Sequence, residues 1–588
     1  MEQSLKSFVI TDNSLYIYIM IKHFFFFLVV FLFMSRLGES QTINNLPQNY
    51  FANPLDINLK LSGTFGELRS NHFHSGLDIK TNQRTGAKVY ATASGYVSRI
   101  KIERYGYGKA LYITHPNGYT SVYAHLEKFS PRIEKYLKKK QYENEAYTIQ
   151  LFPTDLELRV DQSEVVAYSG NSGGSGGPHL HFEIRDSAAR PINPLLMGIE
   201  IPDTKRPLVK EIKAYPLNET STVNGKNEAK LLRLIPLKDG KFKVEPFSAY
   251  GEIGIGVNTS DRQNGANNQN GTFHIETFFN GSKNFEITFD RYAFNESRHI
   301  NQMIDYEHFK NTKSRISRLY VPNGSPLSLY QDNINKGVLQ LYDKDTTHSY
   351  SIKIEDFKKN QVEINMSIKN DPAPDSIPFP NDEKLTFINH NVTYHQKSGP
   401  YSLMIPKGAL YESVFLDIEQ NTDTLKVHSD IVPLHKNMII SYDISSKQKD
   451  NIKQYYIGRV TSWGAVYHVN TRRKGNILSA ATRTLGTYAI SKDDVPPTIK
   501  PVNFKNKQWI SKNTTLKLKL TDKDTGVDAY RATVNGKFIL TEYDYKTGVL
   551  THDFADGVVT DTENELKVIA TDNVGNSTTF EATFYRKS

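Results

Sequence analysis

Two histidines and a glutamate alternate with apolar residues near position 180, in the run His-Leu-His-Phe-Glu-Ile that starts at His179. In a strand, this alternation places His179, His181 and Glu183 on one face and buries the three apolar residues on the other. A glycine-rich loop (residues 170–177) precedes the run, and glycine lets a backbone or a ligand approach closely. Imidazoles bind metals and transfer protons, so we expect a chemical role here, with a plain solvent-facing strand as the alternative.

A second set of metal-ligand types lies about a hundred residues upstream. His74 and Asp78 offer an imidazole nitrogen and a carboxylate oxygen, both good zinc ligands, and Gly76 permits a turn that brings them toward one point. With one histidine of the run at 179–184 they would make three protein ligands and leave one position for water, the layout of a catalytic zinc site. The sequence contains no His-Glu-x-x-His motif, which excludes the thermolysin-type arrangement.

Length and composition place these residues in a multidomain globular protein. The 588 residues predict about four domains, and 38% hydrophobic, 11% aromatic and 23% charged residues exclude disordered, collagen-like and multi-span membrane proteins. The absence of cysteine excludes disulfide scaffolds, thiol nucleophiles and Cys-ligated zinc. The net charge of +9 suits an anionic partner or simply a soluble surface, and the dispersed basic residues predict no nucleic-acid partner.

The first forty residues have the layout of an export signal. An unbroken apolar run, Phe24–Met34, follows basic residues, and the small-x-small sequence at 38–40 predicts cleavage before Gln41. We therefore expect residues 1–40 to be a signal peptide, with Met20 as a candidate true start, and any membrane contact to be transient. An uncleaved anchor is the alternative.

Beyond the signal the chain is predicted to be mainly β, because short alternating or apolar runs are separated by Gly, Asn, Asp and Pro turns. Pro-rich seams separate a first domain at 41–202 from three further domains, which we expect to be β-sandwiches of the immunoglobulin-like type. These domains are predicted at 203–372, 385–492 and 493–588, with a Pro-rich linker at 373–384.

Local patterns refine this β-rich prediction. The segment Ser130–Tyr142 is expected to form a surface helix that Ser-Pro begins. Asp356 and Asp572 each follow apolar residues two and four positions before them and precede an Asn four positions after, which predicts a late strand that enters a hairpin. The second of these resembles the last hairpin of bacterial immunoglobulin-like domains. The turn Asp522–Asp528 could bind calcium, but ordinary turn chemistry is the favoured interpretation.

In chain order, the motifs resemble the lysostaphin-type zinc metalloendopeptidases, which cut peptide cross-links of bacterial cell-wall peptidoglycan. The matching motifs are His-x-Gly-x-Asp at 74–78, Tyr-Ala-His-Leu at 123–126 and the loop and strand at 170–183. The resemblance covers about residues 60–197 and implies an antiparallel β-sheet peptidase domain. Supporting matches lie at Ala91–Val97, Gly106–Gly108 and His115–Tyr119.

The resemblance implies a role for each matching side chain. His74, Asp78 and His181 would hold one Zn²⁺ ion, while His125 and His179 would lie beside it and take a proton from water or stabilise the developing oxyanion. Zinc would lower the pKa of that water and polarise the scissile carbonyl, so no covalent intermediate is needed. Which of the two auxiliary histidines is the base is left open.

Other nearby features are given more ordinary roles. His72 is expected to be polar or to line a substrate groove, His115 to be structural, and Arg69 to contact a substrate carboxylate or to form a structural salt bridge. The segment 127–161 is a long insertion for the family, and forms either one wall of the groove or a surface excursion. Only residues 41–62 precede the peptidase motifs, so any restraint of the enzyme is expected from the C-terminal β-domains.

The sequence therefore predicts an exported zinc endopeptidase that acts on peptidoglycan peptides, in the periplasm or cell envelope or after secretion. The alternative is a non-catalytic wall-binding or hydrolase-activating protein of the same fold, but all three ligand positions and both auxiliary histidines are present, which favours catalysis. A third possibility is an adhesin-like surface protein, but the sequence shows neither a sorting motif nor a hydrophobic C-terminal tail to support it. The C-terminal β-domains are the expected surface for a protein partner, and the bond that is cut is left open.

Overall fold

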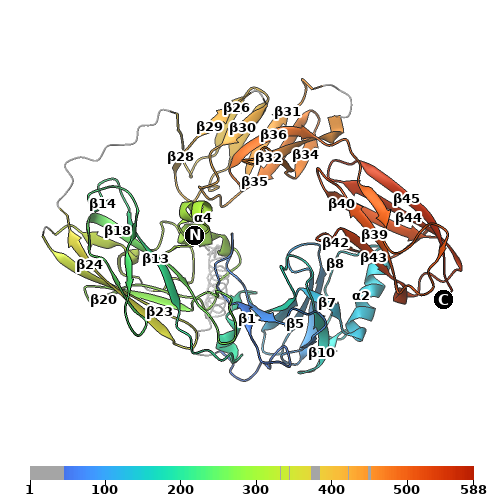
Figure 1. The fold of residues 1–588 in the computed structure, drawn as a ribbon, viewed down its shortest axis with the longest axis horizontal. Coiled ribbons are helices and arrows are strands. Elements are labelled where there is room, and N and C mark those ends of the chain that lie inside the picture. Colours follow the sequence, from blue (N-terminus) through green and yellow to red (C-terminus); the bar gives the residue numbers. More distant parts are fainter. Residues whose placement is uncertain are drawn as a thin grey trace, which may run out of the picture. The chain divides into compact units, whose positions relative to one another are not determined.

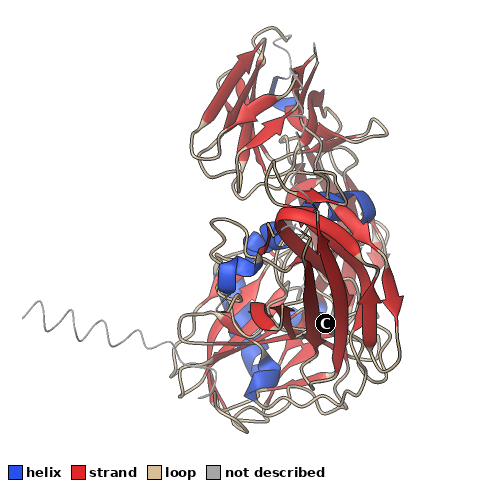
Figure 2. Ribbon diagram, turned by 90° about the vertical axis from the view of Figure 1, so that its left-hand side faces the viewer, coloured by secondary structure: helices blue, strands red, loops and turns tan. Residues whose placement is uncertain are grey.

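A computed structural model describes residues 46–331, 333–343, 345–371, 384–421, 423–447 and 452–587. The predicted signal peptide (1–40) and all but the last residue of the Pro-rich linker (373–384) lie outside these described residues. Residues from Phe51 onward form one compact unit, to which every element named below belongs. Strands dominate the fold, as predicted (Figures 1 and 2). In the part of the chain that the structure describes, no helix is long and apolar enough to cross a membrane.

The first domain, blue to cyan in Figure 1, is built on a 9-stranded sheet whose pairs are all antiparallel, as predicted. Its order is β1-β2-β11-β6-β5-β4-β8, with β12 beside β11 and β9 beside β4. A 3-stranded sheet of order β3-β10-β7 completes the domain. The strand bounds are β1 Leu61–Gly63, β2 Leu77–Lys80, β3 Lys88–Tyr90, β4 Gly95–Ile102, β5 Lys109–Thr114, β6 Thr120–Ala124, β7 Leu126–Phe129, β8 Ile149–Leu151, β9 Arg159–Val160, β10 Val165–Ser169, β11 His179–Arg185 and β12 Pro191–Ile192.

The predicted histidine strand is β11, which lies between β2 and β6 near the middle of the large sheet. Leu180, Phe182 and Ile184 are fully buried, which confirms the apolar face. The polar face is covered as well, because His181 and Glu183 are also buried. Their polar groups must therefore find partners inside the protein.

Helix α2, Pro131–Glu143, lies in the predicted insertion and confirms the helix expected at 130–142. Ser130 is its N-cap residue, and a proline at the first helical position has the φ that a helix needs and no N–H to leave unpaired. Ile133, Leu137 and Gln141 are buried at a spacing of four, the pattern of a helix with one face against the domain.

The second domain, green to yellow in Figure 1, contains a 12-stranded sheet rather than two separately paired sheets. The 14-residue strand β18 connects its two halves, since its end pairs with β13 and its start pairs with β24. The main order is β15-β13-β18-β24-β23-β19-β20. The bounds are β13 Leu208–Pro216, β14 Thr222–Val223, β15 Lys230–Leu232, β16 Leu234–Pro236, β17 Lys241–Val244, β18 Phe247–Ser260, β19 His274–Phe279, β20 Ser282–Thr288, β21 Ser317–Arg318, β22 Leu339–Leu341, β23 Thr347–Glu355 and β24 Gln361–Asn370.

Two short helices in the second domain were missed by the sequence prediction, which placed its one helix in the first domain. They are α3, Ile300–Met303, and α4, Tyr306–Thr312. Both are too short to show a helical apolar period. The start of α4 is fixed instead by a cap, because the Asp305 side chain accepts a hydrogen bond from the backbone N–H of His308.

The third domain consists of two 5-stranded sheets that enclose one core, with a separate β25–β28 pair, and the fourth has a 4-stranded and a 5-stranded sheet around another core. Both are β-sandwiches. The third-domain bounds are β25 Thr386–Ile388, β26 Tyr394–Ser398, β27 Tyr401–Ile405, β28 Val414–Leu416, β29 Ile418–Gln420, β30 Thr424–Val427, β31 Met438–Asp443, β32 Tyr455–Val460, β33 Val466–His468, β34 Thr471–Lys474, β35 Ile477–Thr482 and β36 Gly486–Lys492. Those of the fourth are β37 Thr498–Pro501, β38 Gln508–Trp509, β39 Thr515–Thr521, β40 Val527–Val534, β41 Lys537–Phe538, β42 Glu542–Asp544, β43 Val549–Asp553, β44 Glu563–Asp572 and β45 Ser577–Tyr585.

The repeated signature marks a hairpin in both places, as predicted. Asp356 follows β23 and begins the turn into the antiparallel β24, and Asp572 ends β44 before the antiparallel β45. In each turn the aspartate carboxylate accepts a hydrogen bond from the backbone N–H of the asparagine four residues on. The same side-chain-to-backbone hydrogen bond therefore explains why both turns carry the same sequence pattern.

Candidate metal centre

Strand pairing brings two of the predicted ligands together. In the antiparallel pair of β2 and β11, Asp78 lies directly opposite His181, and directly opposite residues project their side chains to the same face. His74 belongs to the loop that leads into β2. Each of the three side chains is buried, with 5%, 8% and 3% of its residue surface exposed for His74, Asp78 and His181.

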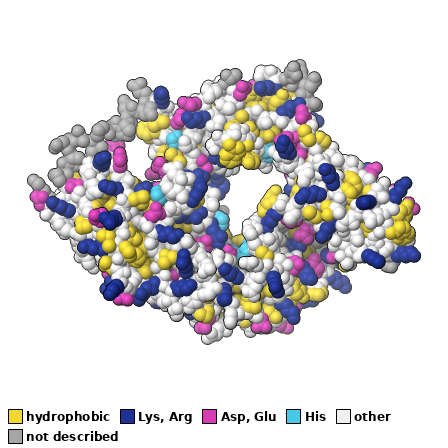
Figure 3. Space-filling view, in the orientation of Figure 1, with side chains coloured by type: hydrophobic (Ala, Val, Ile, Leu, Met, Phe, Trp, Pro, Cys, Tyr) yellow, Lys and Arg dark blue, Asp and Glu magenta, His cyan; other side chains and the backbone are white. Residues whose placement is uncertain are grey.

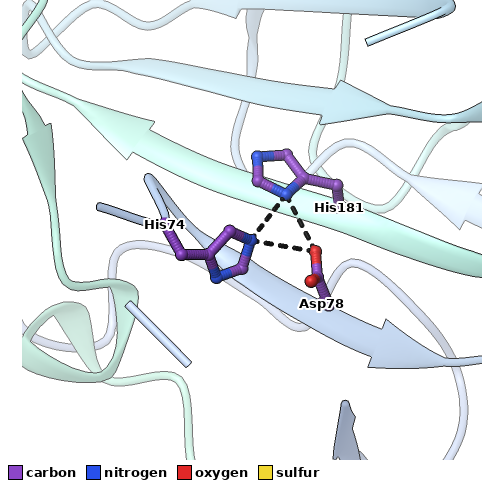
Figure 4. Close-up of side chains that lie close together, drawn as sticks. All are labelled: His74, Asp78 and His181. Atoms are coloured by element: carbon purple, nitrogen blue, oxygen red, sulfur yellow. Dashed lines mark hydrogen bonds and ion pairs between the residues drawn. The ribbon is translucent and has the colours of Figure 1, made fainter. Parts of the chain in front are cut away.

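The three predicted ligands meet at one point (Figure 4). His74 Nε2 lies 3.0 Å from Asp78 Oδ1 and 3.0 Å from His181 Nδ1, and His181 Nδ1 lies 2.9 Å from Asp78 Oδ1. The sequence prediction of His74, Asp78 and His181 as a set thus corresponds to a set of atoms in mutual contact.

The hydrogen bonds behind these atoms decide which lone pairs face the centre. His74 Nδ1 lies 2.7 Å from the Thr64 carbonyl oxygen, and His181 Nε2 lies 2.8 Å from Glu183 Oε1. An N–H must point at each of these acceptors, so in neutral imidazoles the lone pairs of His74 Nε2 and His181 Nδ1 face the centre. Two nitrogen lone pairs and a carboxylate oxygen then face one another with no hydrogen atom between them. A cation bound at this point would satisfy all three atoms. The donor set of two imidazoles and one carboxylate fits zinc.

The electrostatics also favour a positive charge at this point. Burial alone would raise the pKa of Asp78, but the neighbouring imidazoles of His74, His179 and His181, which favour its charged form, hold it well below its usual range. Burial likewise opposes the charged form of His181, yet hydrogen bonds to Asp78 and Glu183 raise its pKa to about 9. A proton and a divalent cation would compete for this site.

Glu183 is the partner that orients His181. It is fully buried, and its Oε1 accepts hydrogen bonds from His181 Nε2 at 2.8 Å, Ser75 Oγ at 2.6 Å and Tyr107 OH at 2.5 Å. Arg185 Nε donates to Oε2 at 2.6 Å. Burial works against ionisation of Glu183, but Arg185 and His181 keep its pKa low, so the carboxylate stays charged.

The two auxiliary histidines lie beside the centre with their rings 4.9 Å apart. His125 Nδ1 is 2.9 Å from the Ser172 carbonyl oxygen and His179 Nδ1 is 2.8 Å from that of Gly177, so both rings donate from Nδ1 and keep a lone pair on Nε2. His179 Nε2 lies 3.4 Å from Asp78 Oδ1. Burial and the charges of His181 and His179 lower the pKa of His125 to about 3, which keeps it neutral.

His125 also has a strained backbone, with a φ of 58°. A non-glycine residue in the left-handed region is uncommon and is retained where the surroundings impose it. Here the backbone N–H of His125 donates to the Tyr107 carbonyl oxygen at 3.0 Å, directly after β6. The residue with this strained backbone is therefore one whose side chain faces the centre.

The three neighbouring residues with more ordinary predicted roles lie outside the ligand set. His72 is exposed. His115 is buried, with Nδ1 3.0 Å from the Ser94 carbonyl oxygen and Nε2 2.9 Å from Ser121 Oγ, a structural arrangement as expected. Arg69 Nη2 donates to Asp78 Oδ2 at 2.8 Å, so of its two predicted roles the structure shows the salt bridge, and shows it to a ligand carboxylate.

A groove of about 830 Å³ opens beside the centre. Asp78 and His179 form part of its wall, together with the glycine-rich loop at 176–177. None of the residues that line this groove belongs to the insertion at 127–161, whereas Glu127, Tyr147 and Thr148 of the insertion line a second cavity on the other part of the glycine-rich loop, at 171–173. The insertion also contacts the fourth domain, because Tyr142 OH donates to Asp556 Oδ2 at 2.7 Å and Lys138 pairs with the same carboxylate.

Several residues that hold the centre were not assigned a role from the sequence. Tyr107 was part of a matching Gly-Tyr-Gly segment, which is the one signal that could have pointed to it. Thr64 acts through its backbone oxygen and Ser75 through a hydroxyl that many turns contain, so neither has a sequence signal. The second domain also contributes, because Tyr292 OH donates to the Phe73 carbonyl oxygen at 2.8 Å, next to His74.

Comparisons with known proteins match two parts of the chain to family models. The model of peptidase family M23 matches residues 72–142, and that of the Zu5-like domain matches residues 385–493. A DD-carboxypeptidase/endopeptidase, Mpg, of Neisseria meningitidis serogroup B is 31% identical over 149 residues, which are 24% of this chain and 28% of that protein. An uncharacterized metalloprotease of Haemophilus influenzae is 28% identical over 28% of this chain and 30% of its own.

Solved structures that match include the catalytic domain of the antimicrobial peptidase lysostaphin from Staphylococcus simulans. It is 20% identical, with a TM-score of 0.16, over 27% of this chain and 95% of that domain. The chain spans less than a third of the length of the curated relatives that it matches. The similarity to the curated relatives thus concerns only part of each of those proteins.

Proposed function

We propose a function from the premise that the N-terminal domain of this chain belongs to peptidase family M23. The chain is an exported, zinc-dependent endopeptidase that hydrolyses the peptide cross-links of bacterial peptidoglycan. The observation that carries the proposal is the meeting of His74 Nε2, Asp78 Oδ1 and His181 Nδ1, three acceptor atoms in contact beside an open groove.

His74, Asp78 and His181 would hold the metal. When bound, zinc supplies Lewis-acid chemistry, which polarises a carbonyl oxygen and lowers the pKa of water. Thr64 and Glu183 fix the two imidazole rings in the tautomers that ligation requires, since each accepts a hydrogen bond from the ring nitrogen that faces away.

His125 and His179 would move the proton. Each ring donates from Nδ1 to a carbonyl of the glycine-rich loop, and Nε2 is therefore the atom that can accept a proton from water and return it to the leaving amine nitrogen. Burial lowers the pKa of His125, so its Nε2 carries a free lone pair, but the same shift makes this ring a weaker proton acceptor than an ordinary imidazole. Either ring, once protonated, can also stabilise the oxyanion.

The groove suggests a substrate that carries negative charge. Lys60, Arg69 and Lys80 line it together with the neutral glycine-rich segment. Stem peptides of peptidoglycan carry free carboxylates, which these cations would attract. Figure 3 shows Lys and Arg dispersed among acidic side chains on the visible face. We infer that the local cations of the groove, rather than a general surface charge, select the substrate.

The remaining parts of the proposal concern location. The predicted signal peptide at 1–40 would deliver the enzyme to the periplasm or cell envelope, where peptidoglycan lies. The three C-terminal β-domains would serve as docking surfaces for the wall or for a protein partner. In this proposal the peptidase domain carries out the reaction and the three β-domains provide additional binding surface.

A digest of purified peptidoglycan sacculi tests the proposal. The zinc-loaded chain from residue 41 is incubated with sacculi beside the variants His181→Ala and His395→Ala, the second a control at an exposed histidine of the third domain. Mass spectrometry of the soluble products should show loss of cross-linked dimers with the wild type and with His395→Ala but not with His181→Ala. Intact cross-links in every sample, with zinc bound, would favour the non-catalytic wall-binding alternative.

A further inference from the structure

A second convergence of ligand atoms lies in the second domain, away from the His74 centre. One carboxylate oxygen from each of Asp203, Asp261 and Asp356 lies within 4.8 Å of the other two. Asp203 precedes β13, Asp261 follows β18 and Asp356 follows β23, so three separate segments bring the carboxylates together. Asp261 and Asp356 are 5% and 3% exposed.

These carboxylates form no ion pair in the described part of the chain, and the charge of Lys205 acts on Asp261 only from further away. Among the described residues, none of the three forms an ion pair with a Lys, Arg or His nitrogen within 4.0 Å. Burial, with the charges of Asp356 and Asp203, raises the pKa of Asp261 to about 8. Like charges that share a buried site repel one another unless a cation or a proton lies between them.

Asn270 supplies an independent observation. It lies directly opposite Asp261, with which it exchanges two backbone hydrogen bonds of 2.8 Å, so the two side chains project on the same side. Asn270 is 2% exposed, yet neither its Oδ1 nor its Nδ2 has a hydrogen-bond partner, and Asp261 Oδ1 has none either. A buried amide with both polar atoms unsatisfied is rare and points to a bound water or ion beside it.

The four side chains share one cavity. Asp203, Asp261, Asn270 and Asp356 are among the residues that line a cavity of about 40 Å³, which is more than the ~10–15 Å³ that a water-sized group needs by the same measure. Asp356 is held in place by Asn360, whose backbone N–H and side-chain amide donate to its two oxygens at 2.9 and 2.7 Å. Each carboxylate oxygen still has a second lone pair available.

We propose that Asp203, Asp261, Asp356 and the Oδ1 atom of Asn270 form a calcium site. All four donors are oxygens, and three are carboxylates, which is the hard donor set that Ca²⁺ binds. Two oxygens at a Ca²⁺ distance of about 2.4 Å on opposite sides of one ion lie about 4.8 Å apart, and the three carboxylate oxygens meet that limit.

The site has a route to the His74 centre. Gly271, next to Asn270, donates its backbone N–H to Thr64 Oγ1 at 2.9 Å, and the Thr64 carbonyl oxygen accepts from His74 Nδ1 at 2.7 Å. Calcium would fix Asn270 and thereby the segment that orients His74. We expect it to stabilise the junction of the first two domains. This goes beyond the proposed peptidase function and does not depend on it.

A second acidic cluster offers a matched control. Asp493, Asp522 and Asp572 also place one oxygen each within 4.8 Å of the others. Their carboxylates accept hydrogen bonds from neighbouring groups, such as Thr525 Oγ1 to Asp493 Oδ2 at 2.6 Å, as Asp203 and Asp356 also do. The second cluster, however, has no counterpart of Asn270, which among the described residues is the one buried amide with neither polar atom partnered. This cluster therefore carries no proposal.

Calorimetric titration of the full chain with CaCl₂, after chelation and reloading with zinc, tests the site. We expect one Ca²⁺ per chain with a Kd at or below about 1 mM, and a thermal unfolding midpoint that rises with calcium. Asp261→Asn should weaken binding at least about tenfold, which is about 1.4 kcal/mol, whereas Asp522→Asn should leave it unchanged. Asp261→Asn removes a repelling charge, so the variant should fold, and circular dichroism checks this.

Three results would overturn the site. They are the absence of calcium binding at concentrations well above that Kd, loss of binding in Asp522→Asn instead of Asp261→Asn, and equal stabilisation by Mg²⁺ at the same concentration. Binding and unfolding are measured without substrate. The outcome is therefore separate from the success or failure of the sacculus digest.

Discussion

Glu183 Oε1 lies 2.8 Å from His181 Nε2, on the side of the ring that faces away from His74 and Asp78. Removal of its charge should loosen the ring and lower the basicity of Nδ1. We expect Glu183→Gln to weaken zinc affinity by about 10- to 100-fold, the usual effect of such an outer partner. Competition with a chromophoric chelator measures the affinity.

Glu143→Gln is the matched control for this change, because Glu143 is solvent-exposed at the end of α2 and pairs with Lys140. It should bind zinc as the wild type does. Equal affinities for Glu183→Gln and the wild type would contradict a role for Glu183 in orienting His181.

The auxiliary histidines should affect turnover and not metal content. Since both project Nε2 toward the centre without belonging to the ligand set, His125→Ala and His179→Ala should each retain one zinc per chain and lose about 10²- to 10⁴-fold in kcat. Metal analysis and initial rates on a soluble peptide substrate measure the two quantities separately.

His125→Asn separates the imidazole from the backbone strain, because asparagine tolerates a positive φ better than most residues. It should fold as the wild type and remain as slow as His125→Ala. Loss of zinc from either alanine variant would instead make that histidine a ligand.

The fourth domain holds the glycine-rich loop beside the centre. Lys546 Nζ donates to the Asn171 and Ser175 carbonyl oxygens at 2.8 and 2.6 Å, and Tyr545 OH donates to that of Gly173 at 3.2 Å. The double variant Tyr545→Phe, Lys546→Met should speed hydrogen exchange of the loop amides. Because this loop also orients His125 and His179, kcat/KM should fall about 3- to 10-fold, which is about 1 kcal/mol in total for the three lost hydrogen bonds.

Lys537→Met, at an exposed lysine of the same domain, is the control and should change neither quantity. Unchanged exchange in the double variant would contradict the contact. A rise in kcat/KM would mean that the contact restrains the enzyme.

Buried Asp290 should make stability depend on pH. Burial raises its pKa to about 6, against an unfolded value near 3.8, so the folded state binds the proton more tightly. Stability is then greatest below the unfolded pKa and falls as the pH rises to about 6, by no more than about 3 kcal/mol. Asp290→Asn should remove this loss and raise the unfolding midpoint at about pH 7.5 but not at about pH 4. Calorimetry at both pH values measures it, and an equal effect at both would contradict the assignment.

The sequence was most informative where a short local pattern determines the secondary structure. The alternation at 179–184 predicted a strand with its apolar face inward, and β11 has that pattern. The Ser-Pro start predicted α2 to within one residue. The ligand set required more, because the register that places Asp78 opposite His181 is a long-range pairing, and the sequence supplied it only through the resemblance.

The rest depended on contacts that no local pattern encodes. Thr64 orients His74 through its backbone carbonyl oxygen, which any residue type would supply. Asn270 is notable only because the fold buries its side chain opposite Asp261 without a hydrogen-bond partner. The insertion at 127–161 contacts a domain about four hundred residues later in the chain, through Tyr142 and Asp556. Short helix α4 is fixed by the Asp305 cap rather than by an apolar period.

Zinc reconstitution tests the central claim most directly. The chain is stripped of metal, dialysed and titrated with Zn²⁺ while peptide hydrolysis and bound zinc are followed together, beside His181→Ala and His395→Ala. We predict that activity is absent without metal, rises in proportion to bound zinc and reaches its plateau at one ion per chain in the wild type and in His395→Ala, while His181→Ala neither binds tightly nor regains activity. Full activity in the metal-free chain, or equal zinc binding by His181→Ala, would contradict the account.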